Sequence, residues 1–596
     1  MSREQKNYTF NRIMLRVIVL QIKAVPWHSA LINLVGVFTA LTITAKVIAT
    51  QGLFDKITDA AAGNAGFIEC LIPLMVLTGI TFGEQILNGV SNFHVEVIFE
   101  KAAGKIKTLL HRKLKHLNPV CFEDPKFLDD LNKAREGIAV IPSFSITLFF
   151  ILSIYIVYFA SIGTYLYNLK PILLFTILIS FIPALIAQII RGKVFTKLEE
   201  ESAPLRRENE YYQKTICERE YFKETRILGA FKYFYTLYHD TLIMLTHKRW
   251  KAENKTALIE LFLNFATFAG MALSTYLLFN ATIAGDITVG AFAAVFGALN
   301  MLFGLMREIV NRHIGAINRD IGKIVNFVRM MDAPERYGDC DGNLSMSEGI
   351  KAENVSFTYP GKETPAVSNV SLEIAQNETI AIVGKNGAGK STLVRLLIGL
   401  YLPLEGKVLV GGLNTLETDP AVLFQRTSGV FQKFQRYKMT LSNNVAISNM
   451  ADFNSDKIIK ILKQAAVELK DIDIETMLSP EFDGIDLSGG EWQRLAIARG
   501  LYRTNRFIVL DEPTASIDPI EETRVFTQFK NLAKNKCAII VTHRLGSAKF
   551  ADRIIVMDSG KITDIGTHDE LMGRMGLYAD MWAKQAKWYE YKEEIS

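Results

Sequence analysis

Stretches without charged side chains dominate the first half of the chain. Four of them contain no Asp, Glu, Lys or Arg: residues 138–169, 171–190, 261–285 and 287–306. Each is at least 20 residues long, which is enough for an α-helix to cross the hydrocarbon core of a bilayer. The pattern therefore predicts an all-α transmembrane domain that lies in a lipid bilayer.

Two weaker apolar stretches raise the number of predicted spans to six. In the second span only the 14 residues from Cys70 to Gly83 separate Glu69 from Glu84, so its ends must reach water or a polar cavity. The six predicted spans are about residues 29–49, 66–90, 138–164, 171–190, 259–280 and 287–306.

The segment before the first span, residues 9–25, mixes apolar residues with three cations. Arg12, Arg16 and Lys23 lie at i, i+4 and i+11, close to one face of a helix. We interpret this segment as an amphipathic helix that lies in the membrane interface. The alternative is the first part of an ordinary surface helix.

The placement of Lys and Arg predicts the orientation of the spans. Basic residues gather before the first span and in residues 101–134 and 191–251. In the short connections between spans three and four and between spans five and six, Lys170 is the sole basic residue. Basic loops face the cytosol. We therefore expect a multi-pass protein of the cytoplasmic (plasma or inner) membrane, with both termini and the long connections in the cytosol. These connections extend as helices and turn back, the first near Pro119 and Pro125.

Polar residues within a predicted span are candidate cargo contacts, because they are costly in lipid. The candidates are Glu84, Asn88, Asn264 and Asn300. A cargo-facing Glu84 would favour a cationic cargo. The alternative is that Glu84 lies at the boundary of the bilayer.

The second half of the chain has a different pattern. Residues 331–346 are polar and rich in turn residues, which is typical of a linker. From Ile350 onward, short β-branched runs alternate with helical stretches, as in an α/β fold. The predicted boundaries are a transmembrane domain at 1–330, a linker at 331–346 and an α/β domain at 347–596 that ends in a helix.

A phosphate-binding motif lies near the start of this α/β domain. The apolar run Ile380–Val383 leads directly into residues 384–391, which match G-x-x-x-x-G-K-[ST]. Backbone N–H groups of such a loop close around a phosphate, and the following helix points its positive end at the anion. Lys390 is placed for the β- and γ-phosphates of ATP, and Ser391 for Mg²⁺. The predicted ATP-binding residues of the loop are Gly384, Lys385, Asn386, Gly387, Ala388, Gly389, Lys390, Ser391 and Thr392.

Two later apolar strands end in residues suited to phosphoryl chemistry. The first is followed by Asp511, which can hold Mg²⁺ through water, and by Glu512, which can orient or deprotonate the attacking water. The second, residues 537–541, leads to His543, which can donate to the γ-phosphate. An isolated His is usually a structural residue, but its position at a strand end after a phosphate loop favours the catalytic interpretation.

Composition and charge exclude several other classes. The chain has 596 residues, too many for one domain. Its net charge of +5 is too small for this size to indicate nucleic-acid binding. The five cysteines form no C-x-x-C pair, so a metal site or a disulfide framework is not predicted.

Residues 350–590 resemble the nucleotide-binding domain of ATP-binding-cassette proteins, and the whole chain resembles an exporter half-transporter. The resemblance rests on the phosphate loop, on Leu487–Glu491 as the signature motif, and on the family order of the other motifs. It implies that Tyr359 stacks on adenine, that Gln432 contacts Mg²⁺ and relays the nucleotide state, and that Asp518 lies in the loop joining two ATPase domains. The signature ends in Glu491 rather than the commoner Gln.

The family mechanism implies a second copy of the chain as partner. Ser488, Gly489 and Gly490 of one subunit would complete the ATP site of the other, so that ATP is held between two chains. Both halves of this composite site are intact here, including Glu512, which favours a homodimer. Lys390, Gln432, Glu512 and His543 are then the expected catalytic residues.

A narrower resemblance concerns the cargo. The stretch Gln432–Thr440, followed by Asn443–Val445, is similar to lantibiotic-type peptide exporters, and so is Cys121–Phe127. Lys433 stands where that group usually has Asp. We therefore expect ATP-driven export of a peptide, such as a modified, lantibiotic-like peptide, by alternating access. The alternatives are a lipid or amphipathic drug exporter and an ATP-gated channel or regulator.

Overall fold

The computed structural model describes residues 10–309, 315–338, 348–467, 472–503, 505–512 and 533–593. The chain divides into two compact units. The first contains Met1–Arg112 and Asp130–Asp332, and the second contains Lys113–Asp129 and Ala333–Ser596. The turn at residues 113–129, which the sequence assigned to the transmembrane domain, therefore belongs to the same unit as the ATPase fold.

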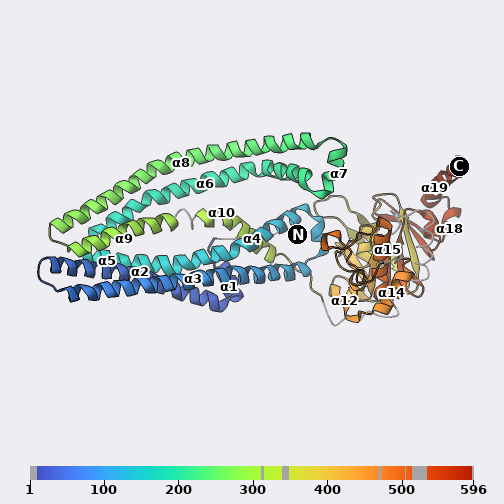
Figure 1. The fold of residues 1–596 in the computed structure, drawn as a ribbon. Helices are drawn as coiled ribbons and strands as arrows, with labels where there is room; N and C mark the ends of the chain where they lie inside the picture. The colour runs from blue at the N-terminus through green and yellow to red at the C-terminus, as the bar shows by residue number, and fades with distance from the viewer. Residues whose placement is uncertain are drawn as a thin grey trace. The chain divides into compact units, whose positions relative to one another are not determined.

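The first unit is all α-helical (Figure 1). Its helices are α1 (Phe10–Ala24), α2 (Pro26–Ala61), α3 (Phe67–Lys115), α4 (Pro125–Phe150), a π turn (Ile151–Tyr155), α5 (Ile156–Leu169), α6 (Pro171–Cys217), α7 (Arg219–Ile227), α8 (Phe231–Ile283), α9 (Val289–Glu308) and α10 (Gly315–Met331). Among the described residues, six helical stretches are long and apolar enough to span a membrane. This confirms the predicted all-α domain with six spans.

Local sequence explains where several of these helices begin. Pro26 and Pro171 occupy the first turns of α2 and α6, where a missing N–H costs nothing. The Thr288 hydroxyl accepts a hydrogen bond from the N–H of Ala291 and caps α9. Helices α3, α6 and α8 extend furthest beyond the predicted spans.

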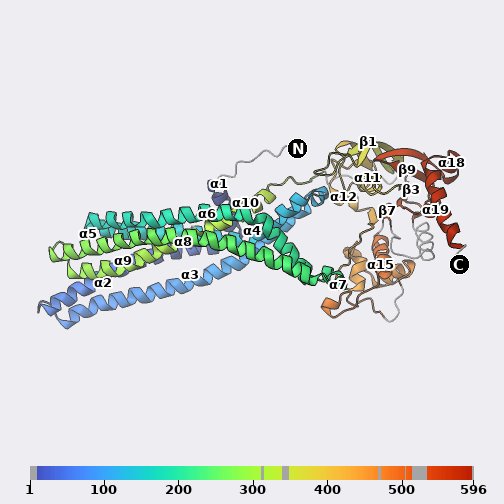
Figure 2. The ribbon, with the colours of Figure 1, turned by 90° about the horizontal axis from the view of Figure 1, so that it is seen from above.

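One close contact joins α9 to α2 in the first unit. A Cβ atom at Gly290, in the first turn of α9, would lie 2.3 Å from Oδ1 of Asp55 on α2. The Gly290 N–H donates to that same carboxylate at 3.0 Å. Figures 1 and 2 show α6 and α8 running side by side along most of their length.

Helix α1 has one buried face. Ile13, Val17, Gln21 and Ala24 are buried, whereas Leu15 is 65% exposed. The buried positions repeat at helical spacing, as in the predicted amphipathic helix. Arg16 forms a bidentate ion pair with Asp332 at the end of the unit.

The second unit contains two β-sheets and their covering helices. Its strands are β1 (Ile350–Phe357), β2 (Val367–Ile374), β3 (Thr379–Gly384), β4 (Glu405–Val410), β5 (Leu413–Asn414), β6 (Thr427–Val430), β7 (Phe507–Asp511), β8 (Cys537–Val541), β9 (Arg553–Asp558) and β10 (Lys561–Gly566). Its helices are α11 (Lys390–Leu397), α12 (Pro420–Phe424), α13 (Leu441–Ala446), α14 (Ser455–Gln464), α15 (Gly489–Tyr502), α17 (Leu545–Ala548), α18 (His568–Gly573) and α19 (Leu577–Glu593).

The larger sheet has the strand order β10-β9-β3-β8-β7-β6. Strands β9, β3, β8, β7 and β6 pair in parallel in that order, and β10 is antiparallel to β9. The smaller sheet, β2-β1-β4-β5, is antiparallel. Every residue of β7 and β8 is buried, which is typical of parallel strands covered on both faces. The carboxyl ends of β3, β7 and β8 therefore lie at one edge, where ligands bind in such sheets.

The turn between α3 and α4 packs on this ATPase fold. It contains a short 3₁₀ helix, Pro119–Glu123, and Val120 contacts the hydrophobic core. The Tyr401 hydroxyl donates to Glu123 at 2.5 Å, and Arg395 lies 3.5 Å from the same carboxylate. This turn is thus tied to the helix that follows the phosphate loop.

Candidate active site

The phosphate loop folds around its own lysine. Lys390 begins α11, and its Nζ donates to the carbonyls of Gly384 and Lys385 at 3.0 Å each. Gly389, just before the helix, has a φ of 94°, and a Cβ there would lie 2.3 Å from the Ala366 carbonyl, so only glycine fits. Burial lowers the pKa of Lys390 from its ordinary value, while Glu512 and Asp511 oppose this shift.

Ser391 and Asp511 form the part of the site that suits a divalent cation. The Ser391 hydroxyl donates to Oδ1 of Asp511 at 3.0 Å. Asp511 ends the buried strand β7, and burial raises the pKa of its carboxyl, a shift that the Ser391 hydrogen bond opposes. A hydroxyl and a carboxylate side by side are oxygen ligands of the kind that Mg²⁺ takes, so these residues fit the ion that the sequence predicts.

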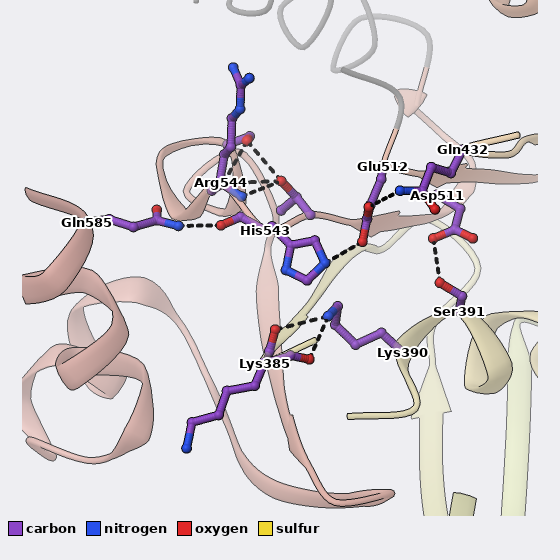
Figure 3. A network of polar contacts seen from close by, with 12 residues as sticks. Lys385, Lys390, Ser391, Gln432, Asp511, Glu512, His543, Arg544 and Gln585 are labelled. Carbon is purple, nitrogen blue, oxygen red and sulfur yellow. Dashed lines mark hydrogen bonds and ion pairs between the residues drawn. The ribbon is translucent and has the colours of Figure 1, made fainter. Parts of the chain in front are cut away.

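Glu512 is held by residues from two other strands. Gln432 follows β6 and donates through Nε2 to Oε2 of Glu512 at 2.8 Å. His543 follows β8, and its Nε2 lies 2.5 Å from Oε1 of Glu512 (Figure 3). The Glu512 N–H donates to the Val541 carbonyl, and its φ is 51°, a conformation that non-glycine residues rarely adopt. Such strain commonly marks functional residues.

The surroundings of His543 disfavour, on balance, the charged form of its imidazole. Burial lowers its pKa below the ordinary 6.5, and Lys390 adds to the shift, whereas Glu512 opposes it. A neutral imidazole can donate from only one nitrogen, and the contact with Glu512 assigns the proton to Nε2.

The predicted adenine-side residue, Tyr359, lies beside the phosphate-loop helix. Its hydroxyl is 3.0 Å from that of Thr392, and Arg395 donates to it at 3.4 Å. Arg395 also donates to Tyr401 at 3.0 Å. No sequence motif singles out Arg395, Tyr401 or Glu123, because no motif spacing connects the turn at 119–123 with residue 401.

The signature residues lie at the exposed start of α15. Ser488 caps this helix and accepts from the Glu491 N–H at 3.3 Å, while the Glu491 carboxylate accepts from the Ser488 N–H at 2.7 Å. This reciprocal pair explains why Glu is accepted at the last signature position. The Ser488 hydrogen bonds also lower the pKa of Glu491. A Cβ added at Gly489 or Gly490 would meet no described atom within 4 Å, and Asp518 lies outside the described residues.

The four predicted cargo contacts lie on three helices, with Glu84 and Asn88 one turn apart on α3. Glu84 on α3 forms an ion pair with Lys46 on α2, at 2.8 Å. The other three, Asn88, Asn264 and Asn300, are exposed on three different helices. Lys46, which the sequence pattern did not single out, therefore offsets the charge of Glu84, and the cargo role of Glu84 stays a prediction.

One family model matches part of the second unit. Residues 367–515 match the family model described as ABC transporter. This stretch of the second unit is an ABC transporter ATP-binding domain. With the six candidate spans before it, the chain has the architecture of an ABC exporter half-transporter, in which ATP hydrolysis is coupled to transmembrane transport.

Relatives of this half-transporter include peptide and lipid transporters. The chain is 27% identical to the subtilin transport ATP-binding protein SpaT of Bacillus subtilis over 84% of this chain and 83% of that protein. It is 26% identical to the nisin transport ATP-binding protein NisT of Lactococcus lactis over 68% of each. It is also 33% identical to the ATP-dependent lipid A-core flippase of Photobacterium profundum, over 50% of this chain and 51% of that protein.

A solved structure has the same fold. A bacterial Atm1-family ABC exporter with ATP bound superposes with a TM-score of 0.75 and 22% sequence identity, over 97% of this chain and 99% of that one. This likeness confirms the predicted fold class along nearly the whole chain.

The lowered pKa of His543 predicts a pH-dependent stability. The unfolded chain protonates this residue at a higher pH than the folded chain does. The free energy of unfolding therefore decreases as the pH falls from 6.5 to the lowered pKa of the folded chain, and this loss remains at lower pH. We expect the Tm of the purified chain to fall from pH 7 to pH 5 more steeply than that of His543→Gln. Parallel Tm profiles for the two proteins would refute this assignment.

The Lys46–Glu84 pair predicts coupled effects on stability. Removing one partner leaves the other charge unpaired within the apolar span, so Lys46→Met and Glu84→Gln should each lower the Tm in detergent. The double variant should lose less stability than the two single variants do together, which corresponds to a coupling free energy of about 1 kcal/mol. Strictly additive Tm losses would show that the two side chains do not interact.

Proposed function

We propose that this chain forms a homodimer in the cytoplasmic membrane and exports a peptide from the cytosol, driven by ATP hydrolysis. The ATPase domain faces the cytosol in this proposal, as the distribution of Lys and Arg predicts. The observation that carries the peptide cargo is the similarity to the subtilin transporter over 84% of the chain. It includes most of the membrane half, where cargo would bind.

The geometry of the active site supports a role for each residue. Lys390 and the N–H groups of the phosphate loop bind the β- and γ-phosphates of ATP, and Tyr359 stacks on the adenine. Ser391, Asp511 and Gln432 would hold Mg²⁺, which neutralises charge on the phosphates when it is bound. Glu512 orients the attacking water and accepts its proton, because its carboxylate is fixed by Gln432 and His543.

The exposed end of α15 supports the dimer. The Ser488 hydroxyl accepts one hydrogen bond and can still donate its own proton to a phosphate oxygen. With Gly489 and Gly490 it presents N–H groups at the start of a helix, which suits an anion. In the proposed dimer, the nucleotide of the partner chain supplies that anion.

The contact of Glu123 with Tyr401 and Arg395 supports a route from nucleotide to membrane. Arg395 lies on the helix that follows the phosphate loop and reaches both Tyr359 and the turn between α3 and α4. A shift of that helix when ATP binds would move the turn. The membrane helices would then alternate between inward-open and outward-open states.

A lipid cargo is the second candidate, because the lipid A-core flippase has a higher sequence identity, 33%, over the half of the chain that it matches. The paired charge of Glu84 and Lys46 also leaves the second span without a net acidic site for a cationic peptide.

ATPase measurements in nanodiscs distinguish the two cargoes. We expect basic, lantibiotic-like peptides to raise the wild-type rate by at least about twofold at constant lipid composition. Glu512→Gln should lose at least about a hundredfold in rate with or without peptide, as expected when a catalytic base is removed. Full stimulation by lipid alone, with no response to peptide, would refute peptide export and favour the second candidate.

A further inference from the structure

The loop that carries His543 is held from outside by the C-terminal helix. Strand β8 ends at Val541, and α17 begins at Leu545. Gln585 of α19 accepts from the Leu545 N–H at 2.9 Å, and its Nε2 donates to the His543 carbonyl (Figure 3). One side-chain amide therefore binds the backbone on both sides of Arg544.

The loop also has hydrogen bonds of its own, but these two bonds do not involve the His543 peptide group that Gln585 binds. The Thr542 hydroxyl accepts from the Arg544 N–H at 3.0 Å, and the Ser547 hydroxyl donates to the Arg544 carbonyl at 2.7 Å. These bonds shape the turn around residue 544. The Gln585 contact instead fixes the peptide group of His543 itself to a different element of the fold.

Aromatic residues of α19 pack on the fold and hold Gln585 near the His543 loop. Tyr578 is buried against Leu545 and Ala548 of α17. Its hydroxyl lies 2.8 Å from Nδ1 of His568, and the Trp582 ring lies 4.6 Å from the His568 ring. Because positions 578, 582 and 585 are spaced i, i+4 and i+7, the glutamine lies on the same helix face as the two aromatic anchors.

We propose that Gln585 is a positioning residue for His543, so that the C-terminal helix is part of the hydrolysis machinery. This inference rests on the proposed catalytic role of His543. The amide suits the task because it offers a donor and an acceptor at once. Fixing the His543 backbone keeps its Nε2 within 2.5 Å of Glu512, and a misplaced imidazole would leave Glu512 with only the Gln432 hydrogen bond.

The test compares two matched substitutions on α19. Gln585→Met keeps the length of the side chain but removes both hydrogen bonds, and Lys584→Met makes the same replacement at the exposed neighbouring position. With the full chain in nanodiscs, we expect Gln585→Met to lower kcat for ATP about fivefold to thirtyfold, with KM changed less than about twofold. Lys584→Met should match the wild type in both constants.

A double-variant cycle shows whether Gln585 acts through His543. We expect Gln585→Met to cause no further loss of kcat in a His543→Ala background, because effects transmitted through one residue are not additive. Gln585→Ala, which removes the amide and leaves nothing to repack, should behave in the same way. Tm values of all variants show whether folding is intact.

Three outcomes would overturn the inference: an unchanged kcat in both Gln585 variants, a loss that follows the fall in Tm, or the same fold-loss in the His543→Ala background. If His543→Ala itself hydrolyses ATP at the wild-type rate, the proposed role of His543 fails instead. The two failures are therefore distinguishable.

Discussion

The active site of the ATPase domain centres on one carboxylate, which is held by residues that follow two other strands. Glu512 accepts hydrogen bonds from Gln432 and His543, which are 80 and 31 residues away along the chain (512 − 432 and 543 − 512). The parallel order β3-β8-β7-β6 places these residues at one edge. Without that order, the phosphate loop, the acid pair and the histidine would be separate motifs rather than one site.

This cluster is only one half of an ATP site. It can bind phosphates and direct a water molecule, but nothing in the described part of the chain places the signature residues of α15 against its own phosphate loop. Ser488 instead caps an exposed helix start whose N–H groups are open to an anion. The two halves suit each other chemically, which is why we propose that two copies exchange them.

Local patterns predicted most of the fold and singled out the residues that meet around Glu512 at the sheet edge. Uncharged stretches of membrane length identify spans by themselves, and Gly384–Ser391, Asp511 and His543 each lie at or just after the end of an apolar strand. The capping pair of Ser488 and Glu491 was within reach of the sequence as well, since a capping box has a fixed spacing.

The contacts that could not be predicted from the sequence join residues that no motif places at a fixed spacing along the chain. Lys46 and Glu84 are 38 residues apart, Gln585 and His543 are 42 apart, and Glu123 and Tyr401 are 278 apart. Each partner taken singly resembles an ordinary polar residue on a helix or in a turn. Only the three-dimensional fold brings them together, and of the three contacts the one between the turn and the ATPase fold carries the proposed coupling.

The most direct test of the shared ATP site uses mixed dimers in which Glu512→Gln and Ser488→Ala lie either on one chain or on opposite chains. If two chains share each site, opposite placement puts both changes in one site and leaves the other intact, whereas placement on one chain damages both sites. We therefore predict more ATPase activity with the changes on opposite chains. Higher activity with both changes on one chain would mean that each chain hydrolyses ATP alone, and would contradict the account.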